Sequence, residues 1–346
     1  MGQPQEGPTP EKSSHEPPPE PEETGSEEED FVPESSHETE EPVVAFTPTI
    51  LDKPLTRFHA GWPRAPWAIV VHYSAGYDAE GCHNTLERRG LSVHATIERD
   101  GVIWRQVADE NRTLHAGDGR WAGVTNMNHH SFGFEIVNLG WLDGVYEGDA
   151  VRTHNVFRPR PGTEINTMGD GTLYYRDEGN TRIITETKCA QVTDHRPSWK
   201  DKYWSIYPPE QMKAVFWLMW QWVRDFDILP ENIIGHEHVS PGRKQDPGAH
   251  FPWKDWEAYL EERCRDEKPE LLDPEHKKAD RIRAVQSHCA RMNLPVGALD
   301  GIWGPNTAAA VRRAVDTHGE MYGFSDVVVA EGNCYALANA LRLVPG

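Results

Sequence analysis

The chain contains several short apolar runs that end at glycines or at predicted turns. The run WAIVVHYSAG at 67–76 predicts a buried strand with His72 at its end. Residues 92–107 hold two β-like runs joined by Asp100-Gly101, a dipeptide that favours a tight hairpin turn. Because a hairpin joins antiparallel strands, the sheet of this region is expected to be mixed rather than purely parallel.

A third strand and a long helix follow the hairpin. Phe132, Phe134 and Ile136 alternate with other residues along 131–140, so they are expected to share one face of a strand. Residues 208–226 begin with proline and carry apolar residues at helical spacing, which predicts a helix. The segment NIIGH at 232–236 predicts another short strand. The fold class is therefore α/β, a mixed β-sheet flanked by helices.

The domain organisation is predicted from changes in composition. The first residues are rich in Pro, Glu and Ser and carry few large apolar residues, which is typical of disorder. Three short helices with intervening turns are predicted near the C-terminus. We therefore expect, in chain order, a disordered leader (1–50), an α/β domain (51–263), a linker (264–277) and a small three-helix domain (278–346). An insert at about 142–200 predicts a ribbon of short strands without an assigned function.

The charge of the chain is concentrated in the leader. The formal net charge is −20, and residues 1–45 contain fourteen acidic residues against one lysine, so the rest carries only −7. This acidity argues against nucleic acid as a partner. The sequence has no run of about 18 apolar residues, so no membrane span is predicted. It also lacks a basic segment followed by an apolar one at its start, so no standard secretory signal is predicted. The five cysteines are odd in number and widely spaced, which favours reduced thiols, although one disulfide stays open.

Two histidines and one aspartate form a candidate metal site. His72 and His236 each end a predicted strand, and Asp246 follows in a loop framed by Pro and Gly. Two imidazoles and a carboxylate leave a fourth position open, as in catalytic zinc sites. The sequence His236-Glu237-His238 lies on a stretch expected to be non-helical, unlike the helical two-histidine zinc motif. Seventeen histidines offer many accidental trios, so spacing alone leaves a structural role for His72 open.

Two charged residues are candidates for catalysis at the same site. Glu135 lies in the middle of a predicted strand, where a carboxylate is costly to bury without a partner or a function. It is either a general base with a raised pKa or an ordinary solvent-facing residue. Lys244 precedes Asp246 by two residues and is either an oxyanion-stabilising cation or a solvated loop charge.

Five motifs occur in the order and approximate spacing of one enzyme family. They are VVHYSAG, SVHATIERDG, LHAG, NHHSFGFEIVN and GHEHVSPGRKQDPG. The region of about 55–260 thereby resembles the zinc-dependent N-acetylmuramoyl-L-alanine amidases of type 2, a superfamily that includes phage lysozyme-like amidases and peptidoglycan recognition proteins. No single motif is decisive, but five in sequence are quite specific.

The resemblance implies roles for individual residues. One zinc ion per chain would be held by the family's three ligand positions, His72, His236 and Asp246. Glu135 matches the catalytic glutamate, which takes a proton from water and passes it to the leaving L-alanine nitrogen, and Lys244 matches the lysine that stabilises the oxyanion. Val93 replaces a tyrosine that is catalytic in one branch, which leaves proton transfer to Glu135. His115 and Asn128 resemble substrate-binding positions.

The C-terminal segment GALDGIWGPNTAAAVRRAV resembles the three-helix peptidoglycan-binding domain type 1. The match covers about 278–345, with a longer connection after the second helix and without the usual aromatic residue there, which weakens the implied wall binding more than the implied fold. Trp303 is either a substrate-binding groove residue or part of the helical core.

The resemblance implies cleavage of the amide between N-acetylmuramic acid and L-alanine, with peptidoglycan as the partner and zinc as the cofactor. A non-catalytic peptidoglycan-binding protein and a zinc peptidase acting on another cell-wall amide are the alternatives. Recognition-only members are expected to lose a ligand, whereas this chain keeps the five residues. The protein would act at the cell wall, in the periplasm or outside the cell. Its biological role would be that of a phage endolysin, a housekeeping amidase or a secreted antibacterial effector. An effector would also have an immunity protein or a secretion adaptor as a partner.

Overall fold

In a computed structural model of the protein, residues 46–142 and 203–344 are described, together with the backbone of short strands between them. Side chains are described for 46–140 and 204–344. The predicted disorder of the leader therefore lies outside the described residues up to position 45. Within the described part, no helix has the length and apolar character that crossing a membrane would require.

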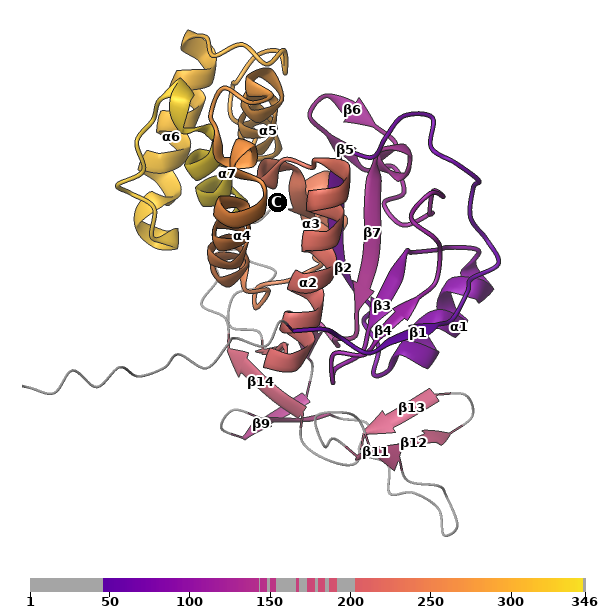
Figure 1. The fold of residues 1–346 in the computed structure, drawn as a ribbon. Coiled ribbons are helices and arrows are strands. Elements are labelled where there is room, and N and C mark those ends of the chain that lie inside the picture. Colours follow the sequence, from indigo (N-terminus) through magenta and orange to yellow (C-terminus); the bar gives the residue numbers. More distant parts are fainter. Residues whose placement is uncertain are drawn as a thin grey trace, which may run out of the picture. The chain divides into compact units, whose positions relative to one another are not determined.

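A six-stranded sheet forms the centre of the α/β part (Figure 1). Its strands, in spatial order, are β1 (Ile50–Asp52), β4 (Ile103–Arg105), β3 (Ala95–Ile97), β7 (Ser131–Ile136), β2 (Ala68–Tyr73) and β16 (Ile233–Gly235). β3 and β4 pair antiparallel across the Asp100-Gly101 turn, whereas all other neighbours in the sheet are parallel. The predicted mixed sheet and its hairpin are confirmed.

The predicted long helix is α2 (Pro209–Phe226), which begins with a proline in its first turn. Its apolar side packs on the sheet residues that point away from the candidate site. The Trp222 ring stacks on Phe132 with ring centroids 4.6 Å apart. This packing fixes the face of β7, because Phe132, Phe134 and Ile136 are fully buried toward the helix. Glu135 is thereby directed to the opposite face.

Two elements early in the chain are not visible in the hydrophobic pattern of the sequence. β1 is an edge strand of three residues, all of them exposed, so it has no buried apolar residue that would indicate a strand in the sequence. Helix α1 (Ala79–Arg89) is mostly polar and buries only Ala79, Cys82 and Leu86. Its ends carry the clearer signal, because the Asp78 side chain accepts a hydrogen bond from the Gly81 amide and Gly90 adopts a left-handed conformation with φ 66°.

The insert and its two flanks contain short strands, as expected for the insert from its turn-rich sequence. They are β8 (Trp141–Leu142), β9 (Gly144–Glu147), β10 (Ala150–Thr153), β11 (Asn166–Thr167), β12 (Leu173–Asp177), β13 (Asn180–Ile183), β14 (Thr187–Gln191) and β15 (Tyr203–Ser205). They pair in one sheet of five strands and one of three. The hairpin β5 (Arg120–Trp121) and β6 (Val124–Thr125) lies before β7 in the chain.

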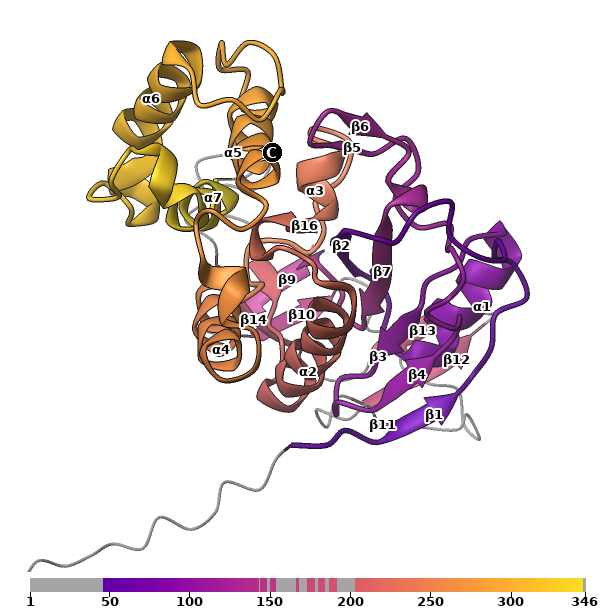
Figure 2. The same cartoon turned by 45° about the horizontal axis from the view of Figure 1, so that its top comes forward.

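The C-terminal region is helical, as predicted. Its helices are α4 (Trp253–Glu267), α5 (Lys278–Arg291), α6 (Pro305–Tyr322) and α7 (Cys334–Arg342), and Figure 2 shows the last three grouped together. The last three share a core that includes Val285, Val311 and Leu341. The predicted linker contains the end of α4 and a 3-10 turn, Pro269–Leu272, whose Leu271 is fully buried. The four described cysteines are free and buried, and Cys189 lies outside the described side chains.

Candidate metal centre and active site

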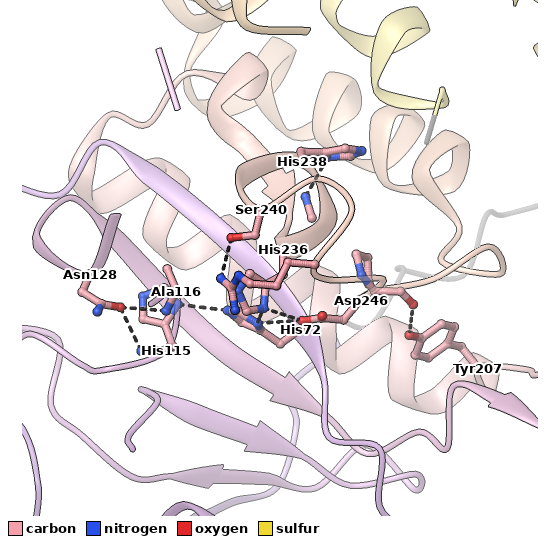
Figure 3. A network of polar contacts seen from close by, with 12 residues as sticks. His72, His115, Ala116, Asn128, Tyr207, His236, His238, Ser240 and Asp246 are labelled. Atoms are coloured by element: carbon pink, nitrogen blue, oxygen red, sulfur yellow. Dashed lines mark hydrogen bonds and ion pairs between the residues drawn. The ribbon is translucent and has the colours of Figure 1, made fainter. Parts of the chain in front are cut away.

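The three predicted metal ligands converge at one end of the central sheet (Figure 3). His72 Nδ1 lies 2.9 Å from His236 Nδ1 and 2.8 Å from Asp246 Oδ2, and His236 Nδ1 lies 2.9 Å from the same oxygen. All three residues are buried, with exposed fractions of 2%, 2% and 8%. Three donor atoms that face one point form an arrangement that could hold a metal ion.

The prediction that the stretch around His236 is non-helical is wrong. His236 is the first residue of a one-turn helix, α3 (His236–Val239), which follows β16 directly. The His238 Nδ1 accepts a hydrogen bond from the Gly235 amide at 3.0 Å, and the Ser240 amide donates to the His236 carbonyl at 2.9 Å. Such a single turn is too short to produce an apolar repeat, so the sequence pattern carries no sign of it.

The loop after α3 is held in place from both sides. The Glu237 amide donates to the Asp246 carbonyl at 2.9 Å, and the Tyr207 hydroxyl donates to the Pro247 carbonyl at 2.6 Å (Figure 3). The first bond connects the residue after His236 to Asp246, and the second holds the residue after Asp246. His236 and Asp246, ten residues apart in the sequence, are therefore fixed in a short distance range without a rearrangement on binding.

The tautomer of His72 follows from its hydrogen-bonding partner. His115 Nε2 faces the Ser131 carbonyl at 3.2 Å, and a carbonyl can only accept, so His115 carries its proton on Nε2. His115 Nδ1 therefore accepts from His72 Nε2, 2.9 Å away. This leaves the lone pair of His72 Nδ1 directed at His236 and Asp246. A ligating imidazole needs such a partner to fix its orientation.

The protonation states favour a cation at this point. Burial, together with the neighbouring His236, lowers the pKa of His72 to about 4, so its ring is neutral at pH 7. Burial alone would raise the pKa of Asp246, but the two histidines hold it below its usual range, and the carboxylate is ionised. A neutral imidazole and an ionised carboxylate are the forms that bind a metal ion, and nitrogen and oxygen donors suit zinc.

Glu135 lies beside these ligands. In the register of β2 and β7, His72 is the partner of Glu135, so both side chains leave the same face of the sheet. Glu135 Oε2 is buried and has no hydrogen-bond partner among the described residues. Burial, and next the charge of Asp246, raise the pKa of Glu135 to about 8, while Lys244 opposes the rise. A nearby divalent cation would favour the ionised form of this carboxylate.

A cavity of about 350 Å³ brings the candidate residues together. Its lining includes His72, Glu135, His236, Lys244 and Asp246, and also His115. Two other sequence-predicted residues do not line it: Asn128 lies behind His115, and Trp303 is partly buried against the helical C-terminal core. Substrate binding by His115, Asn128 and Trp303 stays a prediction.

Comparison with known proteins assigns the region that contains this cavity to a protein family. The profile of the family N-acetylmuramoyl-L-alanine amidase (Amidase_2) matches residues 62–249, more than half of the chain. The chain belongs to this family. The matched range contains His72, Glu135, His236, Lys244 and Asp246.

Individual relatives agree with the family assignment. The chain is 26% identical over 202 residues to the N-acetylmuramoyl-L-alanine amidase AmiD of Escherichia coli, an overlap that covers 56% of this chain and 53% of AmiD. It is 30% identical over 129 residues to a putative N-acetylmuramoyl-L-alanine amidase of Rickettsia conorii, with 36% of this chain and 48% of that protein covered. The chain therefore spans about half the length of these curated relatives. A solved complex of AmiD with an anhydro-muramoyl peptide covers 76% of this chain and 92% of its own, at 20% identity and a TM-score of 0.39.

Sequence reasoning named His115 and Asn128 only as substrate-binding positions and missed that they support His72 in this amidase-family site. Asn128 Oδ1 accepts hydrogen bonds from the amides of His115 and Ala116, at 2.9 and 2.7 Å, and so holds the segment that carries the His115 ring. Gly133 makes room for that ring, because a Cβ at this position would come within 2.3 Å of it. A glycine in the middle of a buried strand was the available signal for such a close approach.

We expect His115→Ala to weaken metal binding about 10- to 100-fold, because it removes the group that fixes the tautomer and orientation of His72. Titration with zinc in competition with a chromophoric chelator measures the affinity. Gly133→Ala should act in the same direction by displacing the ring, whereas His129→Ala in the neighbouring turn should leave the affinity unchanged. Equal affinities of wild type and His115→Ala would contradict the supporting role.

Proposed function

We propose that this chain hydrolyses the amide between N-acetylmuramic acid and the L-alanine of the stem peptide in peptidoglycan. One observation carries the proposal: three buried metal-binding side chains, a half-buried glutamate with one buried and unpartnered oxygen, and a lysine line one cavity within the family-matched range. The named relatives are muramoyl-L-alanine amidases by description, and the proposal extends that activity to this chain.

His72 Nδ1, His236 Nδ1 and Asp246 Oδ2 would hold one zinc ion beside the cavity that these residues line. When bound, zinc supplies a water of lowered pKa and polarises the amide carbonyl. His115 keeps the His72 lone pair directed at the ion. The Tyr207 and Glu237 hydrogen bonds keep His236 and Asp246 in place during turnover.

Glu135 and Lys244 would perform the chemistry that the ligands cannot. Glu135 accepts the proton of the attacking water and delivers it to the departing L-alanine nitrogen, which must be protonated to leave as an amine. Its buried, unpartnered oxygen makes the carboxylate a stronger base than a solvated one. Lys244 lines the same cavity as Glu135 and His72, and its ammonium would stabilise the oxyanion of the tetrahedral intermediate.

The same features weigh against a non-catalytic binding protein. Binding a peptide fragment needs neither a buried, unpartnered carboxylate oxygen nor a lysine in the same cavity, and burying the Glu135 Oε2 without a function would be costly. We further propose that the C-terminal helices form a peptidoglycan-binding type 1 domain, that residues 264–277 connect it to the amidase domain, and that the protein acts at the cell wall. Trp303 is the candidate wall contact of that domain.

Mass spectrometry of soluble products tests the proposed reaction. Muramidase-digested peptidoglycan is incubated with the protein, with and without a zinc chelator. Free peptides that begin with L-alanine, together with peptide-free disaccharides, are expected, and the chelator should abolish both. Intact muropeptides would favour the binding protein, and cleavage inside the peptide would mean that the site acts on a different bond.

We expect Glu135→Gln to lower kcat about 100- to 10,000-fold, the range of a general base that is removed while the substrate site is kept. Zinc content should stay at one ion per chain, because Glu135 is not among the three donors. Product release from a muramoyl-peptide, measured alongside metal analysis, separates the two effects. Glu110→Gln, the same change at an exposed position, serves as the control. Turnover of Glu135→Gln at the wild-type rate would remove Glu135 from the mechanism.

A further inference from the structure

A second cavity lies on the other side of the metal-ligand loop. Its volume is about 670 Å³, the size of a pocket for a short peptide. One wall is the segment His238–Pro241 that follows His236, and a second wall is the hairpin of β5 and β6. The third wall is the end of α5 with the turn that follows it, including Ser287 and Asn293. We refer to this cavity as the junction pocket.

The junction pocket is positively charged within an acidic protein. Its lining contains Arg120, Arg243 and Arg291 against a single acidic residue, Asp118. Arg120 and Arg243 are exposed, and within the described part of the chain neither forms an ion pair. Arg291 also donates from Nε to His288 Nδ1 at 3.0 Å and from Nη2 to the Leu341 carbonyl at 2.6 Å, which fixes its side chain. Such a lining suits an anion, above all a carboxylate.

The junction pocket and the catalytic cavity share Arg243. This residue lines both cavities, and its Nη2 donates to Ser240 Oγ at 2.7 Å, on the loop that separates them. Lys244, the next residue, lines the catalytic cavity. A peptide that extends from the metal centre past Arg243 would therefore approach the junction pocket.

The walls of the pocket are fixed to each other. The Ala122 amide of the hairpin donates to Ser287 Oγ of α5 at 3.0 Å. The ring of Trp121 lies against His288 with centroids 4.8 Å apart, and His288 contacts the ring of His238 at 5.6 Å. Because the C-terminal helices contribute a wall that is packed in this way, the pocket is preformed and loses little entropy on binding.

We propose that the junction pocket binds the carboxylate-bearing distal end of the stem peptide whose amide is cleaved. The inference rests on the proposed function and on the charge of the substrate. In that substrate the lactyl carboxyl of the sugar is consumed in the amide, so the glycan side carries no charge. The stem peptide ends in a free carboxylate and is the part that an arginine-lined pocket recognises. The C-terminal helices thereby select substrates by peptide length.

A comparison of short and long substrates tests the proposal. For the wild type, kcat/KM should be about tenfold higher for a muramoyl-pentapeptide than for a muramoyl-dipeptide, the effect of one or two charge-assisted hydrogen bonds. Arg120→Gln should abolish this preference and leave the dipeptide rate unchanged. Asn293→Asp, which adds a negative charge to the same pocket at an exposed position, should do the same. Arg313→Gln, on the exposed side of α6, is the matched control.

A binding measurement keeps this proposal separate from the proposed function. Calorimetry with the free pentapeptide L-Ala-γ-D-Glu-L-Lys-D-Ala-D-Ala should give a Kd about tenfold weaker for Arg120→Gln than for wild type. If no amide is hydrolysed but this difference is found, the reaction is wrong and the pocket stands. If the wild type cleaves both substrates with equal kcat/KM, or if Arg120→Gln binds the peptide as wild type does, the pocket is not a peptide site.

Discussion

His236→Ala is expected to lose zinc and turnover together, with activity falling to the uncatalysed background. The imidazole is one of three donors, its Nδ1 lies 2.9 Å from both other donor atoms, and it is 2% exposed. With two donors, the site resembles neither a catalytic nor a structural zinc site.

The same variant should lose the part of its stability that depends on the metal, since binding to the folded state alone stabilises that state. Metal analysis and thermal unfolding with and without chelator measure both effects. Chelator should lower the Tm of the wild type toward that of His236→Ala and should leave the variant unchanged. His59→Ala, the same change at an exposed position, should behave as wild type. Stoichiometric zinc in His236→Ala would show that the ligand set is wrong.

The parts of the fold that could be predicted are those in which burial imposes a pattern on the sequence. β2 is a continuous buried apolar run, whereas β7 and α2 bury apolar residues at periods of about 2 and 3.6, and all three patterns are visible in the sequence. β1 and α1 contain few buried residues, so they are determined by pairing and by end caps instead. The one-turn helix α3 is too short for any period and depends on hydrogen bonds from Gly235 and Ser240.

The candidate site also has a part that could be predicted from the sequence and a part that could not. The three donors could be named because His72 and His236 end strands that the sequence predicts, because Asp246 lies in a loop framed by Pro and Gly, and because family motifs surround all three. The contact between His72 and His115 could not be named, because it joins residues 43 positions apart through ring orientations that only packing determines. The junction pocket is a stronger case, since its walls come from β5, β6, α3 and α5, which share no sequence pattern.

The C-terminal helices are joined to the amidase-family part by buried polar contacts. Arg281 of α5 pairs with Glu231, and the two side chains are 1% and 0% exposed. Arg281 Nε also donates to the His276 carbonyl at 2.9 Å, and Arg342 Nη2 donates to the Pro230 carbonyl at 2.7 Å. Burial raises the pKa of Glu231, an effect that the Arg281 charge opposes, so this carboxylate depends on its partner to remain ionised.

Arg281→Met is therefore expected to destabilise the protein by about 3–5 kcal/mol, the usual loss when one member of a buried ion pair is removed. The cause is the uncompensated Glu231 charge rather than lost packing, because methionine fills much of the same volume. Urea denaturation measures the free energy of unfolding, and Arg265→Met, which removes an exposed partner of Glu261, should change it little.

The double variant Glu231→Gln/Arg281→Met separates charge from packing. A neutral amide in place of the carboxylate removes the buried charge, so the double variant should be more stable than Arg281→Met alone. If the two substitutions instead add, the pair contributes no coupling and the junction is held by its apolar contacts. In the expected case, Arg281→Met should also lose the preference for long stem peptides while it still cleaves short ones. The pair fixes the wall of α5 that the junction pocket needs, whereas His72, His236 and Asp246 lie outside that helix.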